Sequence, residues 1–118
     1  MAMSSEGKTS YFYVLHCRDG TLYAGYTTNL ERRLKEHNTG IGAKYTRLKK
    51  RRPLRMIYAE AHPSRSAATK AEAAFKKRTR SQKNTFLIEQ GIKIPFEKQK
   101  TCIIREEPIK DDQHAEKL

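Results

Sequence analysis

The chain has 118 residues, a length typical of one compact domain. Hydrophobic residues make up 36% and charged residues 32%, which allows a small core, and no apolar stretch is long enough to span a membrane. The net charge of +12 calls for an acidic partner, because like charges in one small domain repel each other.

The first ten residues, MAMSSEGKTS, are short and polar, unlike a secretory signal. The two cysteines, Cys17 and Cys102, are far apart, and no Cys-x-x-Cys or His/Cys cluster indicates a structural zinc site. We therefore expect a reduced, cytoplasmic setting. Residues 1–9 are predicted to be disordered.

Two strands are predicted near the N-terminus. Residues 11–17 (YFYVLHC) and 21–26 (TLYAGY) are rich in aromatic and β-branched side chains and flank a turn, which is typical of a β-hairpin. A two-residue loop would place Tyr13 and Tyr23 on opposite faces, whereas a three-residue loop places them on the same face. We favour the longer loop, because its third position takes a positive φ and is occupied here by Gly20.

A helix is predicted from about residue 29 to 38. Thr28 and Glu31 have the spacing of a capping box, with Thr28 as the N-cap. At about 100° per residue, Arg33 and His37 flank the apolar side of this helix rather than its solvent face. Both side chains are therefore candidates for a site on the sheet.

The next elements follow a glycine- and cation-rich connection. Residues 54–61 (LRMIYAEA) predict a third strand. A helix then begins at Ser64 or Ser66 and runs to about residue 79, and another spans residues 82–90 before Gly91.

Glu72 borders the predicted inward stripe of the first of these helices. The spacing directs Ala68, Ala71 and Phe75 inward, and small neighbours would leave a carboxylate accessible at the edge of the core. The alternative is an ordinary solvent-facing glutamate that offsets Lys76 four residues later. The spacing leaves both interpretations open.

The stretch of residues 44–55 (KYTRLKKRRPLR) contains seven cations and no acid. A phosphate backbone suits such a run, because each neutralised phosphate releases a counterion. A merely solvated basic loop is the alternative, and an anionic membrane fits less well since the run lacks an apolar helix face. The candidate nucleic-acid-binding residues are Lys44, Arg47, Lys49, Lys50, Arg51, Arg52 and Arg55.

Together these elements predict an α+β fold, in which helices flank a small three-stranded antiparallel sheet. The domain is predicted to span residues 10–91, which carry the charge excess. Residues 92–118 hold six Lys and Arg and six Asp and Glu, and they predict a polar, mostly disordered extension with one short strand. We take a monomer as the default state.

These residues resemble the GIY-YIG nuclease superfamily, named after two strand motifs about ten residues apart. The motifs stand here as Tyr11-Phe12-Tyr13 and Tyr23-Ala24-Gly25. Two tyrosines, an arginine, a histidine and a glutamate on a later helix follow in the family order: Tyr13, Tyr23, Arg33, His37 and Glu72. The resemblance covers about residues 10–90 and is greatest to the small one-domain bacterial branch. Where some members carry a lysine, this chain has Tyr26.

The resemblance implies a metal-dependent endonuclease that hydrolyses DNA, with branched or damaged DNA as substrates. It implies that Glu72 binds one Mg²⁺ or Mn²⁺ and that Arg33 clamps the scissile phosphate. The two tyrosines would orient water and phosphate, one of them as general base, although a free tyrosine with a pKa near 10 is a poor base at neutral pH. His37 would relay a proton or contact the phosphate. The structural alternatives are core packing for the tyrosines and a helix C-terminal cap for His37.

A second function class stays open. The same charge and the same scaffold would serve a nucleic-acid-binding module without catalysis. Its ligand could be DNA or RNA, ribosomal RNA included, since the charge does not distinguish them. We consider DNA the favoured partner because the resemblance is to DNA-cutting enzymes.

Overall fold

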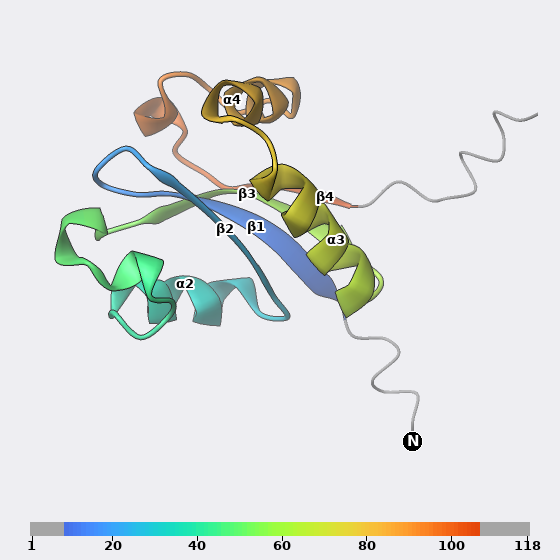
Figure 1. Ribbon diagram of the computed structural model, residues 1–118, viewed down its shortest axis with the longest axis horizontal. Helices are drawn as coiled ribbons and strands as arrows, with labels where there is room; N and C mark the ends of the chain where they lie inside the picture. Colours follow the sequence, from blue (N-terminus) through green and yellow to red (C-terminus); the bar gives the residue numbers. More distant parts are fainter. Residues whose placement is uncertain (1–8, 107–118) are drawn as a thin grey trace, which may run out of the picture.

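The computed structural model of the protein describes residues 9–106. Its centre is a four-stranded sheet in the order β2-β1-β3-β4 (Figure 1). The strands are β1 (Ser10–His16), β2 (Leu22–Thr27), β3 (Arg55–His62) and β4 (Ile103–Glu106). Strand β1 pairs antiparallel with β2 and β3, whereas β4 lies parallel to β3. The predicted α+β class is confirmed, with a sheet that is mixed rather than antiparallel throughout.

The hairpin β1–β2 has the predicted three-residue loop. The backbone N–H of Cys17 donates to the carbonyl of Thr21 (2.9 Å), and Gly20 takes a φ of 88°. This register puts Tyr13 and Tyr23 on the same face of the sheet, as predicted.

Three helices and three 3₁₀ turns complete the fold within the described residues. They are α2 (Leu30–Asn38), α3 (Arg65–Lys76), α4 (Arg80–Glu89), η1 (Tyr45–Arg47), η2 (Lys49–Arg51) and η3 (Phe96–Lys98). The N-cap of α2 is Asn29, whose side chain accepts the N–H of Arg32 (2.9 Å), so the prediction of Thr28 was wrong by one residue. The reason is that the Thr27 hydroxyl at the end of β2 accepts the N–H of Asn29 and sets the helix start one residue later. Of the two serines considered for α3, Ser64 is the N-cap.

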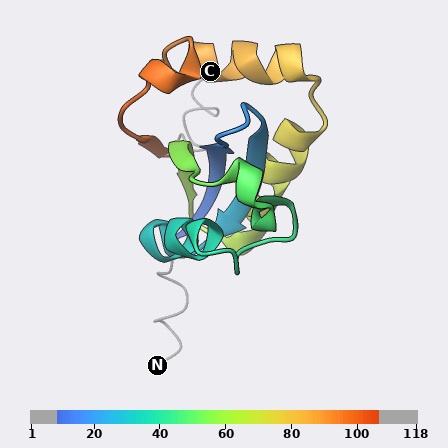
Figure 2. The same ribbon diagram turned by 90° about the vertical axis from the view of Figure 1, so that its left-hand side faces the viewer.

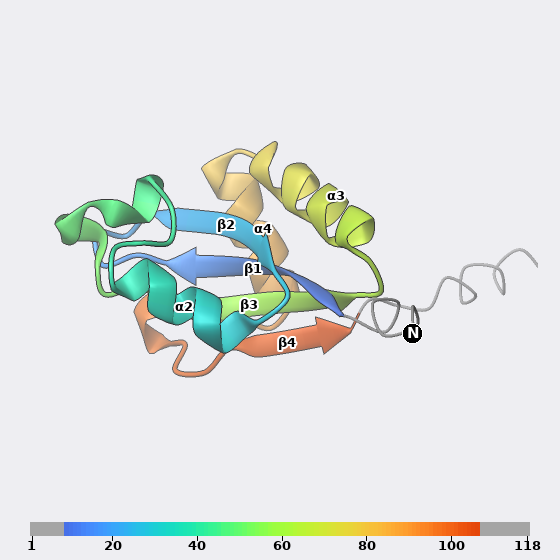
Figure 3. The same cartoon turned by 90° about the horizontal axis from the view of Figure 1, so that it is seen from below.

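The helices cover the sheet from two sides. Helix α2 lies on one face and α4 on the opposite face (Figure 2), while α3 runs along β2 (Figure 3) and packs against β1 and β2 on the α4 side. On the α3–α4 side, Phe12 packs against Tyr58 and Phe75 with ring centroids 6.1 and 5.4 Å apart. On the α2 side, Leu15 and Leu54 form a second cluster with Tyr13.

The fourth strand corrects the prediction of three. Ile92 and Phe96 are buried in the core, and β4 adds to the sheet on the outer side of β3. Arg55 fastens this segment, because its guanidinium donates to the carbonyls of Gln99 (2.5 Å) and Phe96 (3.1 Å). The fold therefore continues beyond residue 91, although the many, evenly balanced charges of residues 92–118 predicted a mostly disordered extension.

The rest of the predicted disordered ends, residues 1–8 and 107–118, lies outside the described residues. Within residues 9–106, no helix has both the length and the hydrophobicity needed to cross a membrane.

Candidate active site

Tyr13 lies in the middle of the sheet, on β1, and is 0% exposed. Its ring lies over Gly25 on β2: a Cβ atom at residue 25 would stand 2.4 Å from the Tyr13 hydroxyl. A glycine is needed here because any side chain would displace the phenol. Burial raises the pKa of Tyr13 to about 12, although the hydrogen bond from Arg33 acts in the opposite direction.

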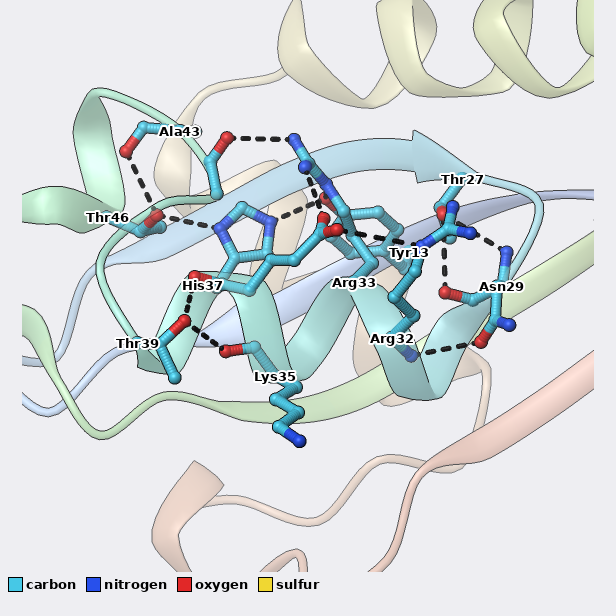
Figure 4. A network of polar contacts seen from close by, with 12 residues as sticks. Tyr13, Thr27, Asn29, Arg32, Arg33, Lys35, His37, Thr39, Ala43 and Thr46 are labelled. Atoms are coloured by element: carbon cyan, nitrogen blue, oxygen red, sulfur yellow. Dashed lines mark hydrogen bonds and ion pairs between the residues drawn. The ribbon is translucent and has the colours of Figure 1, made fainter.

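His37 lies beneath Tyr13, in the last turn of α2, and is also 0% exposed. Its Nε2 atom is 2.8 Å from the Tyr13 hydroxyl, and its Nδ1 atom is 2.7 Å from Oγ1 of Thr46 in η1 (Figure 4). Burial, and then the charge of Arg33, lower the pKa of His37 to about 4, so the ring is neutral at pH 7. Since His37 is fully covered, the geometry favours a positioning or proton-holding role over direct contact with a phosphate.

Arg33 joins α2 to Tyr13. Its Nε donates to the Tyr13 hydroxyl (3.3 Å), its Nη1 to Glu36 (2.9 Å) and its Nη2 to the carbonyl of Gly42 (3.2 Å), as Figure 4 shows in part. Each terminal nitrogen carries two N–H groups, so one on each is left for a ligand. The side chain is 27% exposed, which leaves the guanidinium accessible at the rim of the site.

Tyr23 lies at the half-buried edge of the same group. Its ring meets the His37 ring edge-on (centroids 5.2 Å apart) and stacks on Tyr45 of η1 (5.6 Å, 23° between planes). The Nζ atom of Lys76 lies 5.7 Å from the Tyr23 ring centroid. Among the described residues the Tyr23 hydroxyl has no hydrogen-bond partner, so it is available to a bound ligand or water.

Glu72 approaches this group from α3, which packs against β1 and β2. Its carboxylate pairs with Lys76 (2.8 Å), the interaction expected of an ordinary i,i+4 pair. It is also near enough for its charge to contribute to the raised pKa of Tyr13. The side chain is 20% exposed, and Lys76 engages only one of its two oxygens.

A divalent ion could be held by Glu72 alone. Residues 9–106 contain no cluster of three or more His, Cys, Asp and Glu side chains arranged to hold a metal. Mg²⁺ and Mn²⁺ accept a single carboxylate with water completing the shell, and the partly exposed Glu72 leaves space for water. The donor chemistry therefore fits a hard divalent ion, provided that Lys76 gives up its ion pair with Glu72.

The seven cations of the basic run divide into two groups. Four of them are exposed: Lys44, Arg47, Lys49 and Lys50. The other three are partly buried and hold the backbone. Arg51 donates to the carbonyl of Tyr45 (2.9 Å), Arg52 to that of Arg47 (3.2 Å), and Arg55 to that of Gln99. The exposed group is thus the better candidate for phosphate contacts.

Several residues around the site were missed in the sequence. Thr46 and Tyr45 stand inside the basic run, where the surrounding charges conceal their contacts with His37 and Tyr23. Gly42 approaches His37 so closely that a Cβ atom there would lie 2.6 Å from Nδ1. The paired glycines of Thr39-Gly-Ile-Gly were the available signal for that close approach.

The fold and these contacts define a small α+β domain whose candidate active site is built around two tyrosines of a central hairpin. The chain belongs to the GIY-YIG family: residues 9–85 match the GIY-YIG catalytic domain, and nuclease-type activity is general in this family.

The chain is also similar to small bacterial relatives over most of their length. It is 66% identical over 80 residues to a UPF0213 protein of Enterococcus faecalis, covering 68% of this chain and 91% of the relative. It is 54% identical over 93 residues to a UPF0213 protein of Lactiplantibacillus plantarum, covering 79% and 92%. The solution NMR structure of the protein EF2693 from E. faecalis is similar with a TM-score of 0.51 and 62% identity, covering 73% of this chain and 90% of that one.

Proposed function

We propose that this protein is a divalent-metal-dependent endonuclease that hydrolyses phosphodiester bonds in DNA, with branched or damaged DNA as its substrates. The observation that carries the proposal is the contact of Arg33 with the Tyr13–His37 pair, with Glu72 close by on a separate helix. A guanidinium held rigidly at the rim of a covered site is suited to stabilise the charge that develops on a phosphoryl group.

The two tyrosines take different roles in this proposal. Tyr13 is covered and has a pKa near 12, so it keeps its proton and fixes Arg33 through the hydrogen bond to Nε. Tyr23 is half-buried with an unengaged hydroxyl among the described residues, so it is the tyrosine that contacts the attacking water or the phosphate. Arg33 binds the scissile phosphate with its two remaining N–H groups.

Glu72 would hold Mg²⁺ or Mn²⁺ through a carboxylate oxygen, and the ion would supply charge neutralisation and an activated water. Lys76 must give up its ion pair with Glu72 for this to happen. Once released, its ammonium stays beside Tyr23 and adds positive charge at the phosphate.

DNA would reach the site along the exposed cations of the basic run, which contains η1. We further propose that the protein acts as a monomer in the cytoplasm, in DNA repair.

The test is a cleavage assay with branched, flapped and single-stranded DNA and with RNA, each in Mg²⁺ and in Mn²⁺. Arg33→Ala and Glu72→Gln should each reduce cleavage by at least about 100-fold, as removal of one charge-stabilising group does. Arg32→Ala is the matched control, because Arg32 neighbours Arg33 but its side chain is 58% exposed and pairs with Glu36 (3.6 Å) rather than with Tyr13. Cleavage that survives in Glu72→Gln would remove this residue as the metal ligand.

A non-catalytic nucleic-acid-binding module is the second candidate, favoured by the exposed basic run. It predicts salt-sensitive binding of DNA or RNA and no cleavage with either metal. Competition between DNA and RNA in the same binding assay decides which of the two is the ligand.

A further inference from the structure

The buried hydrogen bonds around His37 allow only one complete assignment of protons. The Thr46 hydroxyl donates its single proton to the carbonyl of Ala43 (3.2 Å), so toward His37 it can only accept. Nδ1 of His37 therefore carries the ring proton and donates it to Thr46 (2.7 Å). Nε2 is then an acceptor and receives the Tyr13 hydroxyl proton (2.8 Å).

The opposite tautomer leaves a buried group without a partner. With the proton on Nε2, His37 would donate to the Tyr13 oxygen, which already accepts from Arg33. The proton of the fully buried Tyr13 hydroxyl would then have no acceptor among the described residues. An unsatisfied buried hydroxyl destabilises this tautomer, and Tyr13 could relieve it only by turning away from Arg33.

The residue before Thr46 supports the other tyrosine. Tyr45 stacks on the Tyr23 ring, and Cζ of Arg51 lies over the Tyr45 ring, 3.7 Å from its centroid. Arg51 is itself held by Asp19 in the β1–β2 loop (3.2 Å). The Tyr45 ring is therefore already engaged by Tyr23 and Arg51, which suits it to support Tyr23 rather than to stack on a nucleobase.

We propose that the turn η1 is a positioning element of the active site, in which Thr46 fixes the His37 tautomer that orients Tyr13 and Arg33, and Tyr45 fixes Tyr23. The catalytic consequence rests on the proposed nuclease function, but the tautomer and the ring contact are properties of the protein itself. Neither residue touches the substrate. The basic run thus contributes two uncharged residues to the site in addition to its cations.

The first test is ¹⁵N NMR of the imidazole nitrogens in the full chain at pH 7. The His37 signal should show a protonated Nδ1 and an unprotonated Nε2 in the wild type and in Thr46→Ser, which keeps the hydroxyl. Thr46→Val keeps the shape but removes the acceptor, so the ring should lose this preference. A proton on Nε2 in the wild type overturns the proposal without any variant, and so does an unchanged tautomer in Thr46→Val.

The second test is cleavage by the same proteins. Thr46→Val should lower kcat about 10- to 100-fold with little change in KM, and Thr46→Ser should restore most of it, as for other residues that act by orienting a functional group. Equal kcat in the wild type and Thr46→Val overturns the proposal. If the wild type cleaves no substrate, the nuclease proposal fails and the NMR result decides the positioning role alone.

Tyr45 has its own pair of variants. Tyr45→Phe keeps the stacked ring and should leave the Tyr23 ring proton shifts and kcat near those of the wild type. Tyr45→Leu should move those shifts and lower kcat about 3- to 10-fold, since one aromatic contact is worth about 0.5–1.5 kcal/mol. Unchanged shifts in Tyr45→Leu remove η1 as the support of Tyr23 and overturn the paired role.

Discussion

The two faces of the sheet are filled in contrasting ways. Under α3 and α4, Phe12, Tyr58 and Phe75 meet ring against ring with aliphatic side chains around them. Under α2, a phenol, an imidazole and a hydroxyl are buried in one hydrogen-bonded series. Burying polar groups stabilises a fold less than burying apolar ones of the same size. The α2 face should therefore contribute less to stability, while its hydrogen bonds hold Tyr13 and His37 of the candidate active site in one arrangement.

The largest expected effect is on the aromatic face. Phe75→Ala should lower the free energy of unfolding by about 3–5 kcal/mol, because Phe75 is 1% exposed and contacts Phe12 and Phe86. Urea denaturation measures it, with the milder Phe75→Leu as a partner variant that should stay folded. A loss below about 1 kcal/mol would mean that this face is not the main source of stability.

On the α2 face, Gly25→Ala should cost about 1–3 kcal/mol, because the new Cβ overlaps the Tyr13 hydroxyl and forces the ring aside. Cleavage and the Tyr13 ring signals in NMR should change with it. Gly20→Ala is the matched control: it strains a positive φ but has no atom within 4 Å of its Cβ. If the Tyr13 signals moved equally in both variants, overlap with the new Cβ at residue 25 would not be the cause of the displacement.

The third prediction concerns pH. The pKa of His37 is near 4 in the folded protein and near 6.5 in the unfolded chain, so only the unfolded chain takes up the proton between these values. Stability is thus complete above pH 6.5 and declines as the pH falls toward 4, by about 1–2 kcal/mol between pH 7 and 5. His37→Gln should show a smaller decline in urea titrations at the two pH values.

Comparison with the wild type is essential in this experiment, because burial also lowers the pKa of His16 and adds to the decline in both proteins. Tyr13, Tyr23, Arg33 and Glu36 all face or influence the His37 ring and stay the same in the pair. If stability declined equally in the wild type and in His37→Gln, His37 would not be buried in its neutral form.

The smallest effect is expected for the exposed cations. Lys49→Ala and Lys50→Ala should each reduce the slope of log K against log salt for DNA by up to about one and leave stability unchanged. Arg55→Ala should lower stability and leave the salt slope unchanged, because the Arg55 guanidinium donates to the carbonyls of Phe96 and Gln99. If only Arg55→Ala altered the salt slope, Arg55 would be the phosphate-binding residue and the exposed lysines would not be.

The elements near the N-terminus were predictable because their signals are local. Gly20 in the third loop position settled the hairpin register, and with it the shared face of Tyr13 and Tyr23. The N-cap of α2 was misplaced by one residue, because two adjacent polar residues, Thr28 and Asn29, compete for that position and the Thr27 hydroxyl decides between them.

Long-range contacts were not predictable from the sequence. Strand β4 is only four residues long. The segment that leads to it is held by Arg55, which lies 48 positions before the start of the strand. The supporting role of Thr46 is likewise visible only when the turn is placed against His37. Glu72 shows the same limit, since spacing could not distinguish a simple partner of Lys76 from a member of the site, and its role stays a prediction.

Strand β4 has a practical consequence for protein production. The family match ends at residue 85, so a fragment cut there would lack the strand that pairs with the outer side of β3. The exposed backbone N–H and C=O groups of β3 would then be free to recruit another chain, and Phe96 would no longer cover the His16 ring. Shortened versions of this domain should therefore extend at least to Glu106, and insolubility of shorter ones would reflect a bare edge rather than a faulty catalytic half.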